Sequence, residues 1–262
     1  MSVYKNDKLS YLKEALESLY SQTLKADIFI QQDGLLSDEL NDYLGDELYK
    51  NKIIYLGKRN ENKGLAYSLN ELLTIVLLRY EYIARMDADD ISYKSRLEDQ
   101  YIFMEEHKHI DVVGGYIKEF GNDIDYEKIV AYPLKHEEMY NFFSKRVPLA
   151  HVTAFFRKNY FKKAGLYRID TLSNEDTLLW MDGFKQGCQF ENLDKVLVNV
   201  RVSNDFFSRR GGLKKVWSDF KDRVLVIQTL GYNISSYLYA LAIVFVNIAP
   251  PKIKIFLYKR LR

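Results

Sequence analysis

Residues 83–90, IARMDADD, place three carboxylates within four positions directly after a short apolar run. Aspartate is a poor strand former, and like charges this close repel one another. A carboxylate cluster at a strand end can cap the next helix, form a solvated loop, or hold Mg²⁺ or Mn²⁺, which prefer oxygen ligands. We expect Asp90 or Ser92 to cap a helix ahead of Tyr93. The D-x-D pair by itself does not decide between a cap, a loop and a metal site.

Strand and helix patterns alternate along the first half of the chain. The predicted strands are residues 1–4, 26–33, 51–57, 80–87 and 111–117, and the predicted helices are residues 9–19, 65–76 and 92–108. A repeated strand–helix–strand order predicts an α/β fold with a mostly parallel sheet flanked by helices on both faces. Because such sheets bind ligands at the carboxyl ends of their strands, Asp33 and Asp87 should face one crevice.

Composition narrows the class of protein. The chain has 262 residues, 47% of them hydrophobic, which is enough for one large core. Lys+Arg 38 against Asp+Glu 36 leaves a net charge of +2, which argues against nucleic acid as a partner. Cys188 is the only cysteine, so no internal disulfide can form, as is typical of a reducing compartment. The first residues lack the apolar stretch of a signal peptide, so we expect a cytoplasmic protein.

The C-terminal segment is different in character. No acidic residue follows Asp222, and residues 237–249 are almost wholly apolar but too short to span a bilayer, which needs about 20 residues. Residues 252–262, KIKIFLYKRLR, interleave basic and apolar side chains, which suits an anionic membrane surface. The alternative is a C-terminal helix packed on the domain with a solvated basic end.

Side chains near other strand ends suit a nucleotide. Tyr4 can stack on a base, and Asp33 can accept a hydrogen bond from a base N–H. Residues 62–64, Asn-Lys-Gly, open the helix at Leu65, and helix N-termini favour anions. Each has an ordinary alternative: core packing for Tyr4, a turn for Asp33, and a solvated side chain for Lys63.

Six segments, in this order, resemble the motifs of family 2 glycosyltransferases of the GT-A fold, in particular bacterial enzymes of O-antigen and capsule assembly. They are SVYKND (2–7), QQDG (31–34), NENKGLAYSLN (60–70), ARMDADDIS (84–92), HVTAFFRK (151–158) and SNEDTLLWM (173–181). The resemblance covers about residues 1–205. It implies a Rossmann-like GT-A domain over 1–210, with a nucleotide-sugar half to about 115 and an acceptor half from about 116. Residues 211–262 would then be a helical, basic segment that contacts the membrane.

The resemblance also implies roles on the donor side. Asp89 would bind Mn²⁺ or Mg²⁺ directly, and Asp87 would contact the ribose or a metal-bound water. The uracil of a UDP-sugar would lie near Tyr4 and Asp33. Phosphate contacts are expected from two basic side chains, Lys63 and Arg85.

On the acceptor side, the resemblance implies Asp176 as the general base and Glu175 as the residue that orients the acceptor. Asn174 and the two acids also have the pattern of a helix start, and both interpretations can hold. His151 and Trp180 are further acceptor-side candidates, although a structural His and a core Trp are common alternatives. The diphosphate can be clamped by three arginines, Arg201, Arg209 and Arg210.

The implied activity is inverting transfer of a hexose, glucose or galactose, from a UDP-sugar to an oligosaccharide on polyprenyl diphosphate at the inner face of the plasma membrane. Two different functions are also compatible with the sequence. A metal-dependent phosphohydrolase would use Asp87 as its nucleophile, but Ser92 is only weakly placed to serve that chemistry. A non-catalytic carbohydrate- or membrane-binding protein would have little reason to keep Asp176 beside an intact D-x-D.

Overall fold

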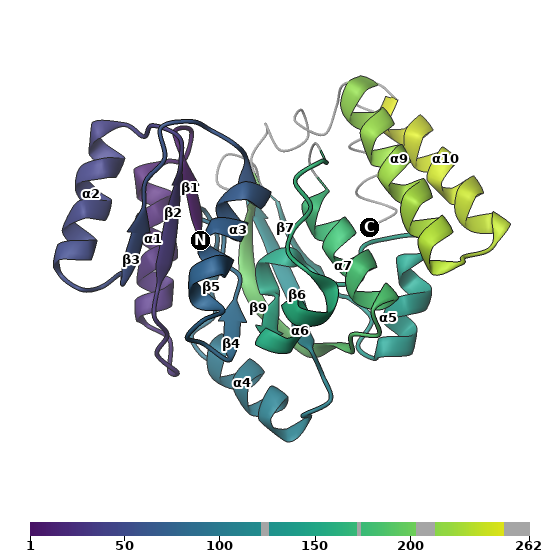
Figure 1. The fold of residues 1–262 in the computed structure, drawn as a ribbon, viewed down its shortest axis with the longest axis horizontal. Coiled ribbons are helices and arrows are strands. Elements are labelled where there is room, and N and C mark those ends of the chain that lie inside the picture. The colour runs from purple at the N-terminus through teal and green to yellow at the C-terminus, as the bar shows by residue number, and fades with distance from the viewer. Residues whose placement is uncertain (122–125, 172–173, 203–212, 249–262) are drawn as a thin grey trace.

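A computed structural model of the chain describes residues 1–121, 126–171, 174–202 and 213–248 (Figure 1). The strands are β1 (Ser2–Tyr4), β2 (Phe29–Asp33), β3 (Tyr55–Gly57), β4 (Tyr82–Ala84), β5 (Ile91–Ser92), β6 (Val112–Gly121), β7 (Glu127–Val130), β8 (Phe155–Arg157) and β9 (Phe190–Val202). The helices are α1 (Leu9–Tyr20), α2 (Asp38–Tyr49), α3 (Leu65–Val76), α4 (Arg96–Glu106), α5 (His136–Phe143), α6 (Lys158–Ala164), α7 (Glu175–Lys185), α9 (Leu213–Leu230) and α10 (Ile234–Ile248), with a short 3₁₀ turn, η1, at His151–Thr153.

The strands form two sheets. β1, β2 and β3 are parallel, and their register places Tyr4 beside Asp33. The second sheet has the order β4-β8-β6-β9-β5, with β7 on β6, and only β6 and β9 run parallel in it. The α/β class is confirmed, whereas a mostly parallel sheet is wrong. The alternating strand–helix pattern describes only the first half of the chain. In the second sheet, strands that are distant in the sequence pair antiparallel.

Two local predictions are also wrong. No helix begins at Ser92, because Ile91 and Ser92 pair with β9 as a short strand. α4 begins only at Arg96, so neither Asp90 nor Ser92 caps it. Asp90 is instead buried and accepts the backbone N–H of Arg201 at 2.8 Å.

Helix α2 was not predicted. It covers the outer side of the first sheet (Figure 1), and its polar sequence buries only Leu40, Leu44 and Glu47. Its start does carry a recognisable signal, since Ser37 accepts the N–H of Leu40 and two acids fill the first turn.

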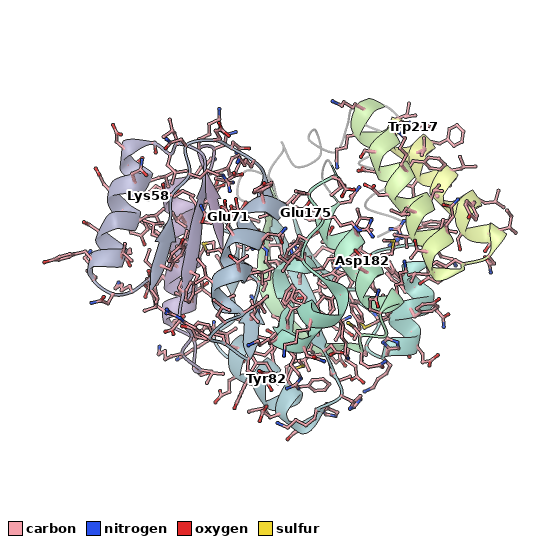
Figure 2. The ribbon with its side chains drawn as sticks, viewed as in Figure 1. Lys58, Glu71, Tyr82, Glu175, Asp182 and Trp217 are labelled. Carbon is pink, nitrogen blue, oxygen red and sulfur yellow. The ribbon has the colours of Figure 1, made fainter. Side chains whose placement is uncertain are left out.

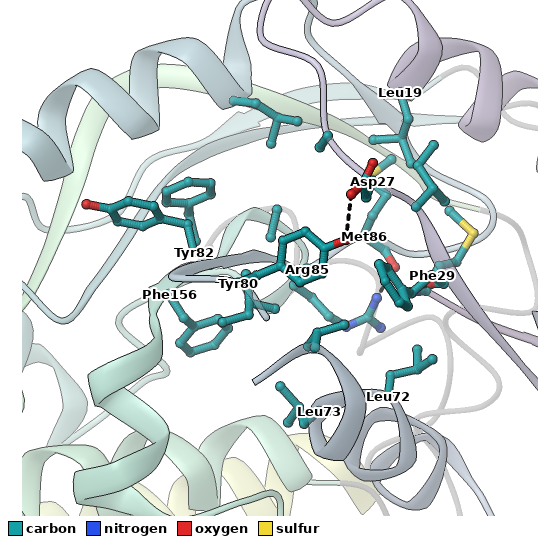
Figure 3. Close-up of a pocket in the computed structure, with 18 of the residues that line it drawn as sticks. Leu19, Asp27, Phe29, Leu72, Leu73, Tyr80, Tyr82, Arg85, Met86 and Phe156 are labelled. Carbon is teal, nitrogen blue, oxygen red and sulfur yellow. Dashed lines mark hydrogen bonds between the residues drawn. The ribbon is translucent and has the colours of Figure 1, made fainter. Parts of the chain in front are cut away.

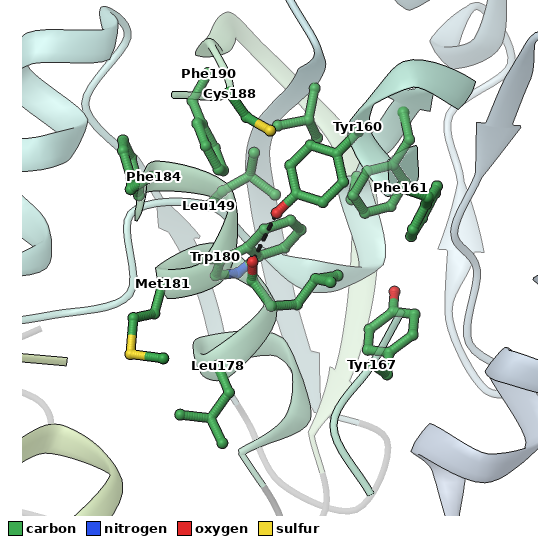
Figure 4. Close-up of a cluster of buried hydrophobic side chains, with 14 of the residues drawn as sticks. Leu149, Tyr160, Phe161, Tyr167, Leu178, Trp180, Met181, Phe184, Cys188 and Phe190 are labelled. Carbon is green, nitrogen blue, oxygen red and sulfur yellow. Dashed lines mark hydrogen bonds between the residues drawn. The ribbon is translucent and has the colours of Figure 1, made fainter. Parts of the chain in front are cut away.

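The largest apolar cluster lies where α7 meets the second sheet (Figure 4). Phe184 and Phe190 stack with ring centroids 4.0 Å apart, and the Tyr160 hydroxyl donates to the Leu179 carbonyl at 2.7 Å. Cys188 is fully buried here, as expected for an apolar role. This packing anchors α7, whose first turn carries Glu175 and Asp176.

The C-terminal helices α9 and α10 pack beside α5 and α7 (Figure 1). The Tyr140 hydroxyl donates to the Leu230 carbonyl at 2.6 Å, and the Arg146 guanidinium donates to the Tyr239 hydroxyl at 3.1 Å. Within the described ranges, no helix is long and apolar enough to cross a membrane. The basic stretch 252–262 lies outside the described residues.

An apolar cavity of about 490 Å³ lies between β2, α3 and β4 (Figure 3). Phe29, Leu72, Ile83 and Phe156 are among the side chains that line it. The candidate carboxylates, all of which lie in the described part of the chain, do not line this cavity, but Arg85, a predicted phosphate contact, does, so the cavity adjoins the predicted site.

Candidate active site

The turn after β2 and the start of α3 form one unit. The buried Asp33 carboxylate accepts the backbone N–H groups of Lys63 at 2.8 Å and Gly64 at 3.0 Å, and Asn62 donates to the Asp33 carbonyl at 3.2 Å. Gly64 has a φ of +92°, in a region that L side chains rarely adopt. The structure therefore brings the predicted nucleotide-binding residues together, beside Tyr4 at the end of β1.

Arg59 completes this unit, although the sequence does not single it out. Its guanidinium pairs with Asp33, with Glu71 at 2.6 Å and with the Ser68 hydroxyl at 2.9 Å. Nothing in the local sequence distinguishes Arg59 from a solvated arginine, because its partners come from separate elements. A buried carboxylate such as Asp33 needs such a counter-charge.

At the end of β4, Arg85 is buried and forms an ion pair with Asp87. Burial is the largest single influence and raises the pKa of the Asp87 carboxyl, but the charge and hydrogen bond of Arg85, together with the other neighbouring groups, outweigh it. The pKa is therefore lowered, and Asp87 is a carboxylate at neutral pH. The pKa of Asp90 is raised, first by burial and then by the charges of Asp87 and Asp89. The pKa values of Asp87 and Asp90 are therefore shifted in opposite directions.

Arg201 in β9 holds the loop that carries these acids. Its backbone N–H binds Asp90, and its guanidinium donates to the Asp89 carbonyl at 3.0 Å and pairs with Glu14 at 2.6 Å. The predicted clamp residue thus lies at the D-x-D loop, with its guanidinium bound to protein groups. The remaining predicted clamp residues, Arg209 and Arg210, lie outside the described residues.

Asp87 and Asp89 fit a divalent cation by the chemistry of their donors. Mg²⁺ and Mn²⁺ usually take one or two carboxylates and share the remaining positions with water and substrate phosphates. Within the described part of the chain, no group of three or more His, Cys, Asp or Glu side chains could form a complete protein cage. A site of this kind would need the diphosphate as a partner.

The predicted base lies in the first turn of α7. The Thr177 N–H donates to Asp176 Oδ1 at 2.7 Å, so Asp176 occupies the helix N-terminus as its sequence pattern indicated. Burial raises the pKa of Asp176, and burial together with the neighbouring Asp176 raises the pKa of Glu175. A raised carboxyl pKa is what a proton acceptor near neutral pH requires.

His151 and Trp180 differ in what they can reach. His151 Nε2 is 2.7 Å from the Tyr167 hydroxyl, and burial followed by the Arg85 charge lowers its pKa to about 3, so the ring is neutral. Trp180 is 0% exposed within the core. The acceptor-side role predicted for Trp180 is therefore wrong and its alternative as a core residue holds, because no face of its ring is accessible.

Tyr167 links the donor and acceptor halves, and its sequence context gives no hint of this role. Its backbone N–H and carbonyl both bind the Asn70 side chain of α3, at 3.0 and 2.8 Å. The Arg85 charge acts on nearby Asp87 and also on Tyr167 and Glu175, so residues from distant parts of the sequence lie within electrostatic reach of one guanidinium. Figure 2 shows Glu175 near the middle of the molecule, between Glu71 of α3 and Trp217 of α9.

These observations define an α/β enzyme with carboxylates gathered at strand and helix ends. The chain belongs to the glycosyl transferase family 2, which its sequence matches over residues 1–165. It is 32% identical to the amylovoran biosynthesis glycosyltransferase AmsE of Erwinia amylovora, over 99% of this chain and 97% of AmsE. The resemblance inferred from the motifs, and the class of enzyme, are confirmed.

Two further proteins are similar. One is the UDP-Gal:alpha-D-GlcNAc-diphosphoundecaprenol beta-1,3-galactosyltransferase of Escherichia coli, 26% identical over 99% of this chain and 94% of its own length. The second is GalNAc-T7, whose structure with UDP, GalNAc and Mn²⁺ shares the fold with a TM-score of 0.63 at 14% identity, over 87% of this chain and 47% of that one.

Proposed function

We propose that the protein is an inverting, metal-dependent hexosyltransferase of bacterial surface-polysaccharide assembly. It would move glucose or galactose from a UDP-sugar to an oligosaccharide carried on polyprenyl diphosphate. The observation that carries this proposal is the ion pair of buried Arg85 with Asp87, which interacts electrostatically with Glu175 in the first turn of α7, beside Asp176. The names of the Erwinia and Escherichia relatives support the pathway and the type of acceptor.

On the donor side, uracil lies between Tyr4 and Asp33. Because the backbone N–H groups of Lys63 and Gly64 are bound to Asp33, the Lys63 ammonium group is the part of this turn that would meet the diphosphate. Asp89 and Asp87 would hold Mn²⁺ or Mg²⁺, as the presence of Mn²⁺ with UDP in GalNAc-T7 suggests. Bound there, the cation supplies charge neutralisation for the departing diphosphate.

On the acceptor side, Asp176 takes the proton of the attacking hydroxyl. The acceptor oxygen forms its bond to the sugar C1 while the bond from C1 to the UDP oxygen breaks, and UDP leaves with that electron pair. Attack from the face opposite the leaving group inverts C1, so an α-linked donor gives a β-linked product. Glu175 orients the acceptor hydroxyl, and His151 borders the acceptor as a neutral imidazole.

The C-terminal helix supplies the membrane contact. Ile234, Leu238, Leu241, Phe245 and Ile248 recur every three or four residues along α10, and all are exposed. The basic sequence that follows, and the lack of acids after Asp222, match an anionic lipid surface. A lipid-linked acceptor would be met at that surface, which places the enzyme at the cytoplasmic face of the membrane.

The direct test is transfer from UDP-[³H]galactose and UDP-[³H]glucose, with Mn²⁺, to a synthetic α-GlcNAc-diphosphate carrying a short alkyl chain. Asp176→Asn should reduce kcat by at least about 100-fold because the base is lost, with the KM for the donor nearly unchanged. Asp182→Asn, on the same helix but paired with Arg168, is the matched control. Full activity of Asp176→Asn would overturn the assignment of the base.

A further inference from the structure

Helix α9, which lies outside the family match, holds the start of α7. An Asn at the position before a helix usually accepts a backbone N–H. Among the described residues, the Asn174 side chain makes no such bond; its amide instead donates to Asp219 at 2.9 Å and to Asp222 at 2.8 Å. Both N–H donors of Asn174 are thereby used by α9.

The segment before α7 is held by the same helix. The Thr171 hydroxyl donates to Asp222 at 3.1 Å, so one carboxylate binds two positions on the approach to α7. Lys215 pairs with Asp219 at 3.3 Å. The candidate base lies only two residues after Asn174, so these contacts hold the segment that leads directly to Asp176.

Arg223 follows Asp222 directly and is fixed by α5. Its guanidinium donates to the Phe143 carbonyl at 2.8 Å and lies 5.5 Å from the centroid of the Phe143 ring. This places a partly buried cation where α5, α7 and α9 meet. Its positive charge interacts electrostatically with the Asp176 carboxylate, which follows Asn174 by two residues.

We propose that α9 is a working part of the active site: Asp219 and Asp222 position α7 through Asn174, and Arg223 is the positioning charge for the Asp176 carboxylate. This inference builds on the proposed role of Asp176, but its test does not need the acceptor. It assigns a role to a helix that the family match does not cover.

The charges around Asp176 define what Arg223 should do. Burial raises the pKa of Asp176, while the Thr177 hydrogen bonds and the Arg223 charge lower it. The neighbouring groups that also interact with Asp176 are Glu175 and Tyr167, and Arg85 and Asp87 act in turn on Glu175. Without Arg223, the protonated form of Asp176 is favoured, because a charge that opposes the effect of burial on its pKa is removed.

The test is ¹³C NMR titration of the aspartate carboxyl carbons in the full chain, with the Asp176 signal assigned from its loss in Asp176→Asn. Arg223→Met should shift the midpoint of that signal upward, and Arg223→Lys should restore it towards wild type. Lys221→Met, an exposed cation on the same helix, is the control and should change nothing. An Asp176 midpoint that is the same in Arg223→Met and wild type would overturn the inference.

The positioning contacts need a second readout. Asp222→Asn keeps the shape but removes the charge that binds Asn174 and Thr171, and we expect kcat to fall with little change in the KM for UDP-sugar. A fall in melting temperature with unchanged kcat would mean that α9 is only structural. If Asp176→Asn is fully active, the proposed base fails; if that variant is inactive and only the Arg223 result is negative, this inference alone fails.

Discussion

Single side chains in this protein serve both the fold and the site. Asp33 is an example, since one buried carboxylate holds the N-terminus of α3 and also lies beside Tyr4 at the proposed nucleotide site. Arg85 is another, since a buried cation stabilises the charged form of Asp87. Removal of one such group leaves its buried partner without a hydrogen bond or counter-charge, which lowers the free energy of unfolding by more than the lost contact contributes.

Asp33→Asn should lower the free energy of unfolding by about 1–3 kcal/mol, because Arg59 and two backbone N–H groups lose a charged acceptor. Urea unfolding measures this. Asp46→Asn, at an exposed acid that pairs with Lys50 only at 3.9 Å, should change it by less than about 0.5 kcal/mol. Equal losses in the two variants would show that Asp33 is not a structural anchor.

His151 should make stability depend on pH. Its pKa is about 3 in the folded protein, against about 6.5 in the unfolded chain. Because only the unfolded state binds the proton between these values, the free energy of unfolding falls as pH falls from 6.5 to 3, by at most about 1.4 kcal/mol per pH unit. His151→Gln should remove that slope in urea titrations at several pH values, whereas exposed His109→Gln should keep it. A slope unaffected by His151→Gln contradicts the buried, neutral imidazole.

Among elements, the start of α3 shows how backbone geometry builds the nucleotide end. Gly64 has positive φ and directs its N–H to Asp33. Gly64→Ala should destabilise the protein by about 1–2 kcal/mol and weaken UDP binding. Gly45→Ala, inside α2 with no atom within 4 Å of the added methyl group, should instead stabilise it by up to about 1 kcal/mol. Thermal melting of both variants gives the comparison, and destabilisation by Gly45→Ala would contradict it.

The sequence predicted those elements whose signal is local. The strands at residues 26–33 and 80–87, helix α3 and the acids at the strand ends follow from periodicity and turn chemistry. Pairings across long separations were not predictable, because Ile91 meets Asn199 only once the fold is formed. For the same reason, Arg59 and Tyr167 could not be predicted, because their partners come from distant elements. The burial of Trp180, which excludes an acceptor-side role, also depends on the complete fold.

For the whole molecule, the three proposed functions fall on different elements. The first sheet carries the proposed nucleotide site and α7 carries the candidate base. Helix α10 lies at the far end of the molecule (Figure 1) and has a stripe of exposed apolar side chains. Helix α9 connects the last two, since it contacts α7 on one side and α10 on the other. A membrane-bound acceptor would therefore meet the enzyme on the side that holds Asp176.

The stripe on α10 can be tested in the full chain by sedimentation with phosphatidylcholine vesicles containing about 30% phosphatidylglycerol. Leu238→Glu and Phe245→Glu should each reduce binding several-fold, because each places a charge on the apolar stripe. Gln228→Glu, at an exposed position of α9, adds the same charge elsewhere and should have a smaller effect. Unchanged vesicle binding, together with loss of a dimer in the stripe variants, would show that a second copy covers this face.

The most direct test of the central claim is thermal melting with UDP, with and without Mn²⁺, in the wild type and in Asp89→Ala. UDP at a hundred times its dissociation constant adds about 2.7 kcal/mol, which corresponds to a rise of roughly 5–10 °C in a chain of this size. We predict a rise that needs both UDP and Mn²⁺ and is lost in Asp89→Ala. Absence of any rise with UDP and metal in the wild type would contradict a metal-dependent UDP-sugar site at Asp87 and Asp89.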